Sequence, residues 1–172
     1  DPHSEVMPAL INNCYVVNID GVGLGFGGCY DGVVAPDAGA AKRAERVAKM
    51  LNTPLINAWK TRDIADGHSS IVSFGIEPIV GVQKLLIVDD ICDGGGTFIG
   101  LGKHIKTLGQ SYGIELDLFV SHGLFSKGQN GLFDVFENVF TTDSTQFRHH
   151  AALDIIVAPV VDKLIEKAFE LV

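Results

Sequence analysis

Two adjacent carboxylates followed by a glycine-rich turn are the part of the sequence best suited to chemistry. The segment, residues 89–97, reads Asp-Asp-Ile-Cys-Asp-Gly-Gly-Gly-Thr. It follows an apolar run, residues 85–88, that is typical of a strand buried on both faces, and it precedes residues 98–108, whose apolar side chains recur at helical spacing. Amides at the start of a helix bind phosphate, because free N–H donors and the positive end of the helix dipole converge there. This order predicts a strand, a phosphate-binding turn and a helix.

The polar side chains of this segment favour a sugar phosphate as the ligand. Thr97 offers a hydroxyl donor, and Asp89 and Asp90 are suited to accept hydrogen bonds from vicinal hydroxyls, directly or through Mg²⁺. A plain strand-to-helix turn with Asp93 as its N-cap is the alternative.

A second strand-turn-helix unit occurs earlier in the chain. Gly32–Ala35 leads through residues 36–39 into residues 40–51, whose apolar side chains share one helical face. Two such units predict a parallel sheet. Four further strands are expected at residues 55–58, 116–120, 139–142 and 155–158. Residues 160–169 are expected to form a closing amphipathic helix.

Two regions do not fit this pattern of alternating strands and helices. Residues 60–73 are polar and mixed, which predicts a mobile loop or an excursion from the sheet. Residues 21–28, GVGLGFGG, are too glycine-rich for a core strand. Trp59, just before the polar region, is expected in the core.

The composition excludes several classes of protein. The chain has 172 residues, 47% of them hydrophobic, which is ample for a folded core. Its 13 Lys and Arg against 21 Asp and Glu give a net charge of −8, which argues against a nucleic-acid partner. The three cysteines have neither zinc-site spacing nor a disulfide framework, so the expected location is cytoplasmic. No segment has the roughly 18 consecutive apolar residues of a membrane span, so no membrane partner is expected.

The segment from residue 88 to residue 97 closely resembles the phosphoribosyl-pyrophosphate (PRPP) motif of type I phosphoribosyltransferases. Other segments resemble the ribose-phosphate diphosphokinases, or PRPP synthetases, which share that fold. Residues 33–43 are similar to the family's pyrophosphate loop and the helix after it, and residues 60–62 to the Lys-x-Arg at the base of its catalytic flexible loop. Residues 121–126 are similar to a Thr-His-Gly-like turn, and residues 140–144 to a Thr-Asp/Asn-Thr/Ser segment. Residues 1–4 are similar to an Asp-x-His segment.

This resemblance implies an α/β fold of the phosphoribosyltransferase type I kind: a parallel twisted sheet flanked by helices, with a mobile loop. It also implies that ATP donates its β,γ-diphosphoryl group to ribose 5-phosphate, giving PRPP and AMP, with Mg²⁺ as the cofactor. The implied site residues are Lys60 and Arg62 for catalysis; Asp89, Asp90, Asp93, Gly94, Gly95, Gly96 and Thr97 for ribose 5-phosphate; Asp37, Ala38 and Gly39 for the diphosphate; and His3 and Asp37 for the metal.

The resemblance also implies how the chain is organised. Residues 1–31 are expected to form a segment at a lobe boundary, and residues 32–172 the phosphoribosyltransferase-like domain, in a homo-oligomer whose small-molecule partners are ribose 5-phosphate and ATP or PRPP. A nucleobase phosphoribosyltransferase that consumes PRPP and a non-catalytic homologue of the synthetases are the alternatives. The pair Lys60 and Arg62 and the turn containing His122 favour the synthetase.

Overall fold

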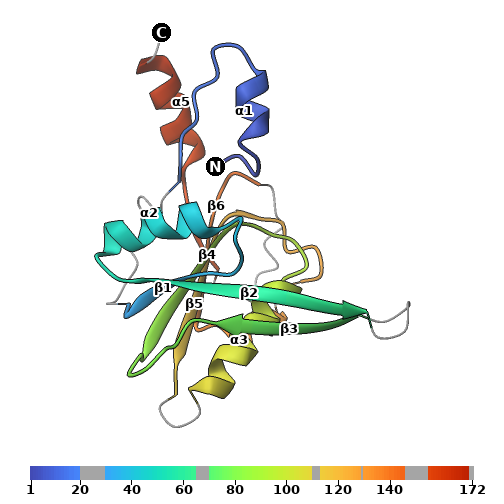
Figure 1. Ribbon diagram of the computed structural model, residues 1–172. Helices are drawn as coiled ribbons and strands as arrows, with labels where there is room; N and C mark the ends of the chain where they lie inside the picture. Colours follow the sequence, from blue (N-terminus) through green and yellow to red (C-terminus); the bar gives the residue numbers. More distant parts are fainter. Residues whose placement is uncertain (20–29, 65–69, 110–112, 129, 146–154, 171–172) are drawn as a thin grey trace.

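The computed structural model describes residues 1–19, 30–64, 70–109, 113–128, 130–145 and 155–170 as a single sheet with helices packed on it (Figure 1). The strands are β1 (Gly32–Ala35), β2 (Leu55–Ile64), β3 (Ser70–Ile76), β4 (Lys84–Cys92), β5 (Glu115–Gly123), β6 (Asn138–Thr142) and β7 (Ile155–Ala158). The helices are α1 (Val6–Leu10), α2 (Ala41–Leu51), α3 (Gly96–Leu108), α4 (Asn130–Phe133) and α5 (Val161–Glu170).

The seven strands lie in the order β3-β2-β1-β4-β5-β6-β7. All neighbouring pairs are parallel except β2 and β3, which are antiparallel. After β1 the chain builds β2 and β3 on one side of it, and then returns to place β4 on the other side. The strand order therefore reverses between β1 and β4, and the loops that follow these two strands meet at one edge of the sheet.

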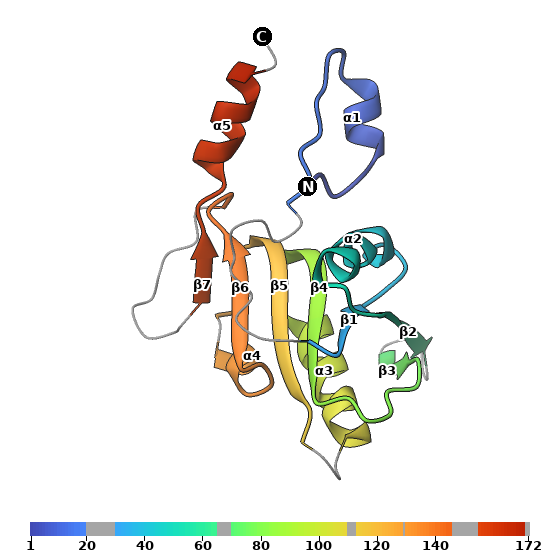
Figure 2. The same ribbon diagram turned by 90° about the vertical axis from the view of Figure 1, so that its left-hand side faces the viewer.

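Two apolar layers cover the two faces of the sheet, one under α3 and one under α2. Side chains of β4 alternate between the layers: Leu85 and Ile87 pack with α3, whereas Leu86 and Val88 pack with α2. This alternation confirms that the run at residues 85–88 is a strand buried on both faces. Figure 2 shows β4 and β5 side by side at the middle of this arrangement.

The predicted strands and helices are all present, and the structure adds β3, α1 and α4. The prediction of a loop over residues 60–73 is wrong for most of its length, because β2 continues to Ile64 and pairs with β3 in a regular antiparallel register. Trp59 was expected in the core, but it is 53% exposed and covers Gly75 of β3. The glycine-rich residues 21–28 lie outside the described part of the chain.

Helices α1 and α5 project beyond the edge of the sheet where the strands β1 and β4 end (Figures 1 and 2). Both carry exposed apolar side chains, among them Val6, Leu10, Ile165 and Phe169. Among the described helices, none is both long enough and apolar enough to cross a membrane.

A buried carboxylate links the amino-terminal ends of β4, β5 and β6, at the edge of the sheet opposite to α1 and α5. Asp117 on β5 is 1% exposed, and its Oδ2 accepts a hydrogen bond from the Tyr30 hydroxyl at 2.7 Å. Its Oδ1 accepts bonds from the backbone N–H and the side-chain amide of Asn138, both at 3.0 Å. The Lys84 ammonium lies 3.3 Å from Oδ2 and supplies the opposite charge. Burial and the hydrogen bond to Asp117 raise the pKa of Tyr30, so the phenol remains a neutral donor.

We expect Asp117→Ala to lower the free energy of unfolding by about 3 kcal/mol, because it leaves three donors without their acceptor and leaves the partly buried Lys84 ammonium with only Glu115 as its counter-charge. Urea unfolding followed by circular dichroism measures the change. The exposed Asp134→Ala is the matched control and should change stability by less than about 0.5 kcal/mol. Equal stabilities of the two variants would contradict a structural role for the Asp117 cluster.

Candidate functional site

A cavity of about 420 Å³ opens where the strand order reverses between β1 and β4. Ligands of open α/β sheets bind at such points, outside the carboxyl ends of the strands. The cavity is lined by the loop after β4, by Asp37 from the loop after β1, and by one residue of the N-terminal segment; the polar lining residues are His3, Asp37, Asp89, Asp90, Asp93 and Thr97. The structure thus brings together most of the residues that the sequence singled out.

The glycine-rich loop presents its backbone to this cavity. Gly95 has φ +72°, and a Cβ on it would lie 3.2 Å from Cδ2 of Leu132, so glycine meets both a conformational and a packing requirement there. Among the described residues, no side chain caps the start of α3, so the alternative in which Asp93 is its N-cap is wrong. The first amides of α3 therefore keep their hydrogen-bonding capacity for a ligand.

The acidic pair lies near the end of β4, two residues before this loop. The Asp90 side chain is only 7% exposed, and its Oδ2 lies 2.7 Å from Nδ1 of His3. Burial would raise the pKa of Asp90, but the hydrogen bond to His3 and the charge of Arg43 outweigh it and lower that pKa below its usual value. Burial, together with the neighbouring charge of Asp90, raises the pKa of Asp89 to about 7. The two carboxylates therefore share a site that lacks enough positive charge for both.

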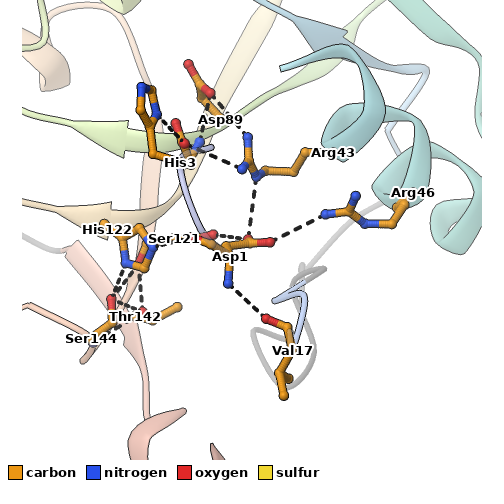
Figure 3. A network of polar contacts seen from close by, with 11 residues as sticks. Asp1, His3, Val17, Arg43, Arg46, Asp89, Ser121, His122, Thr142 and Ser144 are labelled. Carbon is orange, nitrogen blue, oxygen red and sulfur yellow. Dashed lines mark hydrogen bonds and ion pairs between the residues drawn. The ribbon is translucent and has the colours of Figure 1, made fainter. Parts of the chain in front are cut away.

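The guanidinium of Arg43 also faces the acidic pair, and the sequence reasoning did not assign Arg43 a role. Its guanidinium is buried and lies 3.5 Å from each of three carboxylates, those of Asp1, Asp89 and Asp90 (Figure 3). Arg43 projects from the face of α2 that packs on the sheet, beside Ala44. An arginine on the buried face of an amphipathic helix was the signal in the sequence that pointed to such a role.

The two motifs at residues 121–126 and 140–144 meet beneath the N-terminal segment and do not line the cavity. His122 Nε2 donates to the carbonyl of Asp1 at 2.8 Å, and its Nδ1 lies 2.7 Å from the Ser144 hydroxyl. The Ser121 hydroxyl donates to Oδ2 of Asp1 at 2.5 Å, and the Thr142 hydroxyl donates to the Ser121 carbonyl at 2.6 Å. Figure 3 shows that these contacts hold the segment that carries His3.

The loop after β1 is organised by its own carboxylate. Oδ1 of Asp37 accepts hydrogen bonds from the amides of Gly39 and Ala40, at 2.9 and 3.2 Å. Asp37 lines the cavity, while Ala38 and Gly39 are exposed beside it. The loop predicted to contact a diphosphate therefore reaches the same cavity as the glycine-rich loop.

Lys60 reaches the site from β2. Its Nζ donates to the Thr97 hydroxyl at 3.1 Å, which links the strand next to β1 with the start of α3. Arg62 lies two residues further along β2, and its side chain is outside the described part of the structure. Of the two predicted catalytic residues, Lys60 is thus brought to the cavity.

The donors around the cavity fit a Mg²⁺ ion that is shared with a phosphate ligand. Within the described residues, no group of three or more His, Cys, Asp or Glu side chains is arranged to hold a metal by itself. Mg²⁺ usually binds one or two carboxylates together with waters and substrate phosphates, so a complete protein cage is not required. His3 and Asp37 line the same cavity, but Nδ1 of His3, whose side chain is 76% exposed, already contacts Asp90.

Comparison with known proteins agrees with this geometry. The phosphoribosyl transferase domain family matches residues 23–145. The chain is 35% identical over 94 residues to the ribose-phosphate pyrophosphokinase of Cereibacter sphaeroides, a match that covers 55% of this chain and 26% of that protein. It is 26% identical over 141 residues to the ribose-phosphate pyrophosphokinase of Ureaplasma parvum, covering 78% of this chain and 41% of the relative. The chain therefore matches less than half the length of these curated relatives.

The fold is shared with a solved structure, the phosphoribosylpyrophosphate synthetase from Mycobacterium smegmatis. The TM-score is 0.65 at 24% identity, over 83% of this chain and 46% of that one. With a family match that spans well over half of the residues, and with the acidic pair and the glycine-rich loop at the carboxyl end of a central parallel strand, this chain belongs to the phosphoribosyl transferase domain family.

Proposed function

We propose that this chain is the ribose-5-phosphate-binding part of a ribose-phosphate diphosphokinase, which transfers diphosphate from ATP to ribose 5-phosphate and releases AMP. The observation that supports this proposal is the single cavity shared by the acidic pair, the glycine-rich loop and Asp37, with Lys60 at its edge. The relatives named ribose-phosphate pyrophosphokinase support the same reaction class.

The proposed roles follow from the order of groups around the cavity. The 5-phosphate would bind the amides of residues 94–97 and the Thr97 hydroxyl, where donors and the helix dipole favour an anion. The ribose hydroxyls would donate to the carboxylates of Asp89 and Asp90. The anomeric hydroxyl would then face the loop of Asp37, where the incoming diphosphate would bind next to Ala38 and Gly39, the residues that follow Asp37 in this loop.

Phosphoryl transfer depends mainly on positioning and on neutralising charge. Mg²⁺, held by Asp37 and by phosphate oxygens, with Asp89 or His3 as further candidate donors, would neutralise negative charge on the transferred group. Lys60 and Arg62 would stabilise the charge that develops during the transfer, Lys60 as a point charge and Arg62 through its fork of donors.

Two other functions make different predictions for the same assays. A nucleobase phosphoribosyltransferase would turn over PRPP with a purine or pyrimidine base and would release no AMP from ATP. A non-catalytic homologue would bind ribose 5-phosphate without turnover. A coupled assay for AMP release, run beside calorimetric titration of ribose 5-phosphate with and without Mg²⁺, separates the three.

Removing the charge of the acidic pair should abolish most of the sugar phosphate binding. We expect Asp89→Asn combined with Asp90→Asn to weaken the affinity for ribose 5-phosphate in Mg²⁺ at least about 100-fold, because two charged acceptors are lost. Isothermal calorimetry measures the affinity. The double variant Asp134→Asn with Asp162→Asn removes the same charge at exposed positions away from the cavity and should bind like the wild type. Unchanged affinity in the first double variant would overturn the proposed function.

The shape of the glycine-rich loop should matter independently of its charge. Gly95→Ala places a Cβ at φ +72° and against Leu132, so we expect the affinity for ribose 5-phosphate to fall about tenfold as the loop shifts. Gly81→Ala is a matched control, because Gly81 also has φ +72° but has open space around it. Both variants should lose stability in urea because of the same unfavourable φ, with a further loss in Gly95→Ala from the contact with Leu132, and only Gly95→Ala should bind poorly. Equal binding by the two would mean that the loop does not hold the phosphate.

Lys60 should act on turnover more than on binding. We expect Lys60→Ala to lower the rate of AMP release about 100- to 1,000-fold, as is typical when one preorganised charge is removed from a transition state, while the affinity for ribose 5-phosphate changes by less than about tenfold. The exposed Lys49→Ala on α2 is the control and should retain the full rate. A rate loss shared by both lysine variants would argue against a catalytic role.

A further inference from the structure

The turn that follows β5 is attached directly to the glycine-rich loop. Strand β5 runs beside β4 with Gly123 paired to Cys92, the residue before the loop. The amides of Leu124 and Phe125 both donate to the carbonyl of Cys92, at 2.8 and 3.1 Å. Phe125 adopts φ +49° with its ring buried, and its carbonyl accepts the amide of Gly128 at 2.9 Å. Any residue of this turn therefore keeps a fixed place relative to the loop.

Lys127 lies on this turn, and its side chain covers the loop. Its Cδ and Cε are 3.1 and 3.3 Å from the point where a Cβ on Gly94 would lie. The residue is exposed, so the stem packs on the loop while the ammonium stays in solvent. Within the described part of the chain, Lys127 has no hydrogen bond or ion pair.

The side chains that line the cavity carry more negative than positive charge, so a further cation would be stabilised there. Four carboxylates line the cavity, those of Asp37, Asp89, Asp90 and Asp93. Arg43 is occupied by the acidic pair and by Asp1, and it sits on α2, not at the glycine-rich loop. Lys60 reaches the Thr97 end of the loop, so a phosphate dianion seated beside Asp93 would be stabilised further by a positive charge at the Gly94 end.

We propose that Lys127 is a phosphate-binding residue, whose ammonium pairs with the phosphate group of the sugar phosphate held by the loop of residues 93–97. The inference rests on the proposed function and deepens it, because it adds a side chain from the turn after β5 to a phosphate site otherwise built from backbone amides and Thr97. It also assigns a selectivity: Lys127 favours phosphorylated over unphosphorylated sugars.

The test compares ribose 5-phosphate with ribose, titrated calorimetrically into the wild type, Lys127→Gln, Lys127→Arg and Lys103→Gln. Lys103 is an exposed lysine on α3, away from the loop, and provides the matched control. We expect Lys127→Gln to weaken ribose 5-phosphate binding about tenfold or more, Lys127→Arg to restore most of it, and Lys103→Gln to stay within twofold of the wild type. The weak affinity for ribose should be the same in all four proteins.

Salt supplies a second readout that a structural role would not move. The ratio of affinities between the wild type and Lys127→Gln should shrink as the salt concentration rises, because the pair with phosphate is exposed. Equal ribose 5-phosphate affinity of the wild type and Lys127→Gln would overturn this inference and leave the proposed function standing. Absence of ribose 5-phosphate binding by the wild type would overturn the proposed function, and the role of Lys127 with it.

Discussion

The desolvation of two adjacent carboxylates, Asp89 and Asp90, is the constraint on which the rest of the site depends. They lie near the carboxyl end of β4, a strand that is buried on both faces, where an unpaired charge costs several kcal/mol. Arg43 meets both carboxylates but at 3.5 Å, and it also faces Asp1. One cation spread over three carboxylates offsets only part of this cost, which explains why the pKa of Asp89 is raised while that of Asp90 is lowered. A ligand that brings Mg²⁺ and hydroxyl donors to the pair would supply what the protein leaves incomplete.

The order of the strands determines which groups surround that pair. β1 and β4 are parallel neighbours, and each is followed by a helix, so the starts of α2 and α3 both lie at the carboxyl edge of the sheet. Each helix start provides amides and a positive dipole end, which partly balance the four carboxylates of the cavity. Lys60 reaches the same edge because β2 lies next to β1 and runs parallel to it. The cavity therefore combines acidic side chains, suited to hydroxyls and metal, with backbone donors, suited to phosphate.

Much of the fold and part of the site could be predicted from the sequence, because they depend on local patterns. The apolar run before Asp89 and the helical spacing after Thr97 identify their elements without reference to the rest of the chain. The hairpin of β2 and β3 was missed because the second half of β2, residues 60–63, is polar, although Val72, Phe74 and Ile76 of β3 alternate with Ser73 and Gly75. Trp59 was wrongly assigned to the core because its strand lies near the edge of the sheet. Arg43 and Asp1 escaped notice as partners since 42 positions separate them in sequence and only the folded sheet brings them together.

The contacts of the N-terminal segment show how far the site extends beyond the loops that touch the cavity. His3 can contact Asp90 because Asp1, two positions before it, is held from two sides. Arg43 of α2 contacts Asp1 on one side, and Ser121 and His122 of β5 contact it on the other. These partners come from elements that flank β4 on different faces and edges, so the segment cannot be positioned until the sheet around β4 is complete. The motif at residues 121–126 therefore has a structural role that does not require contact with a ligand. Its first part orients the segment that carries His3, and its last part anchors the turn that places Lys127 on the glycine-rich loop. Strand β5 thereby organises both ends of the cavity, whereas β4 supplies the groups between them.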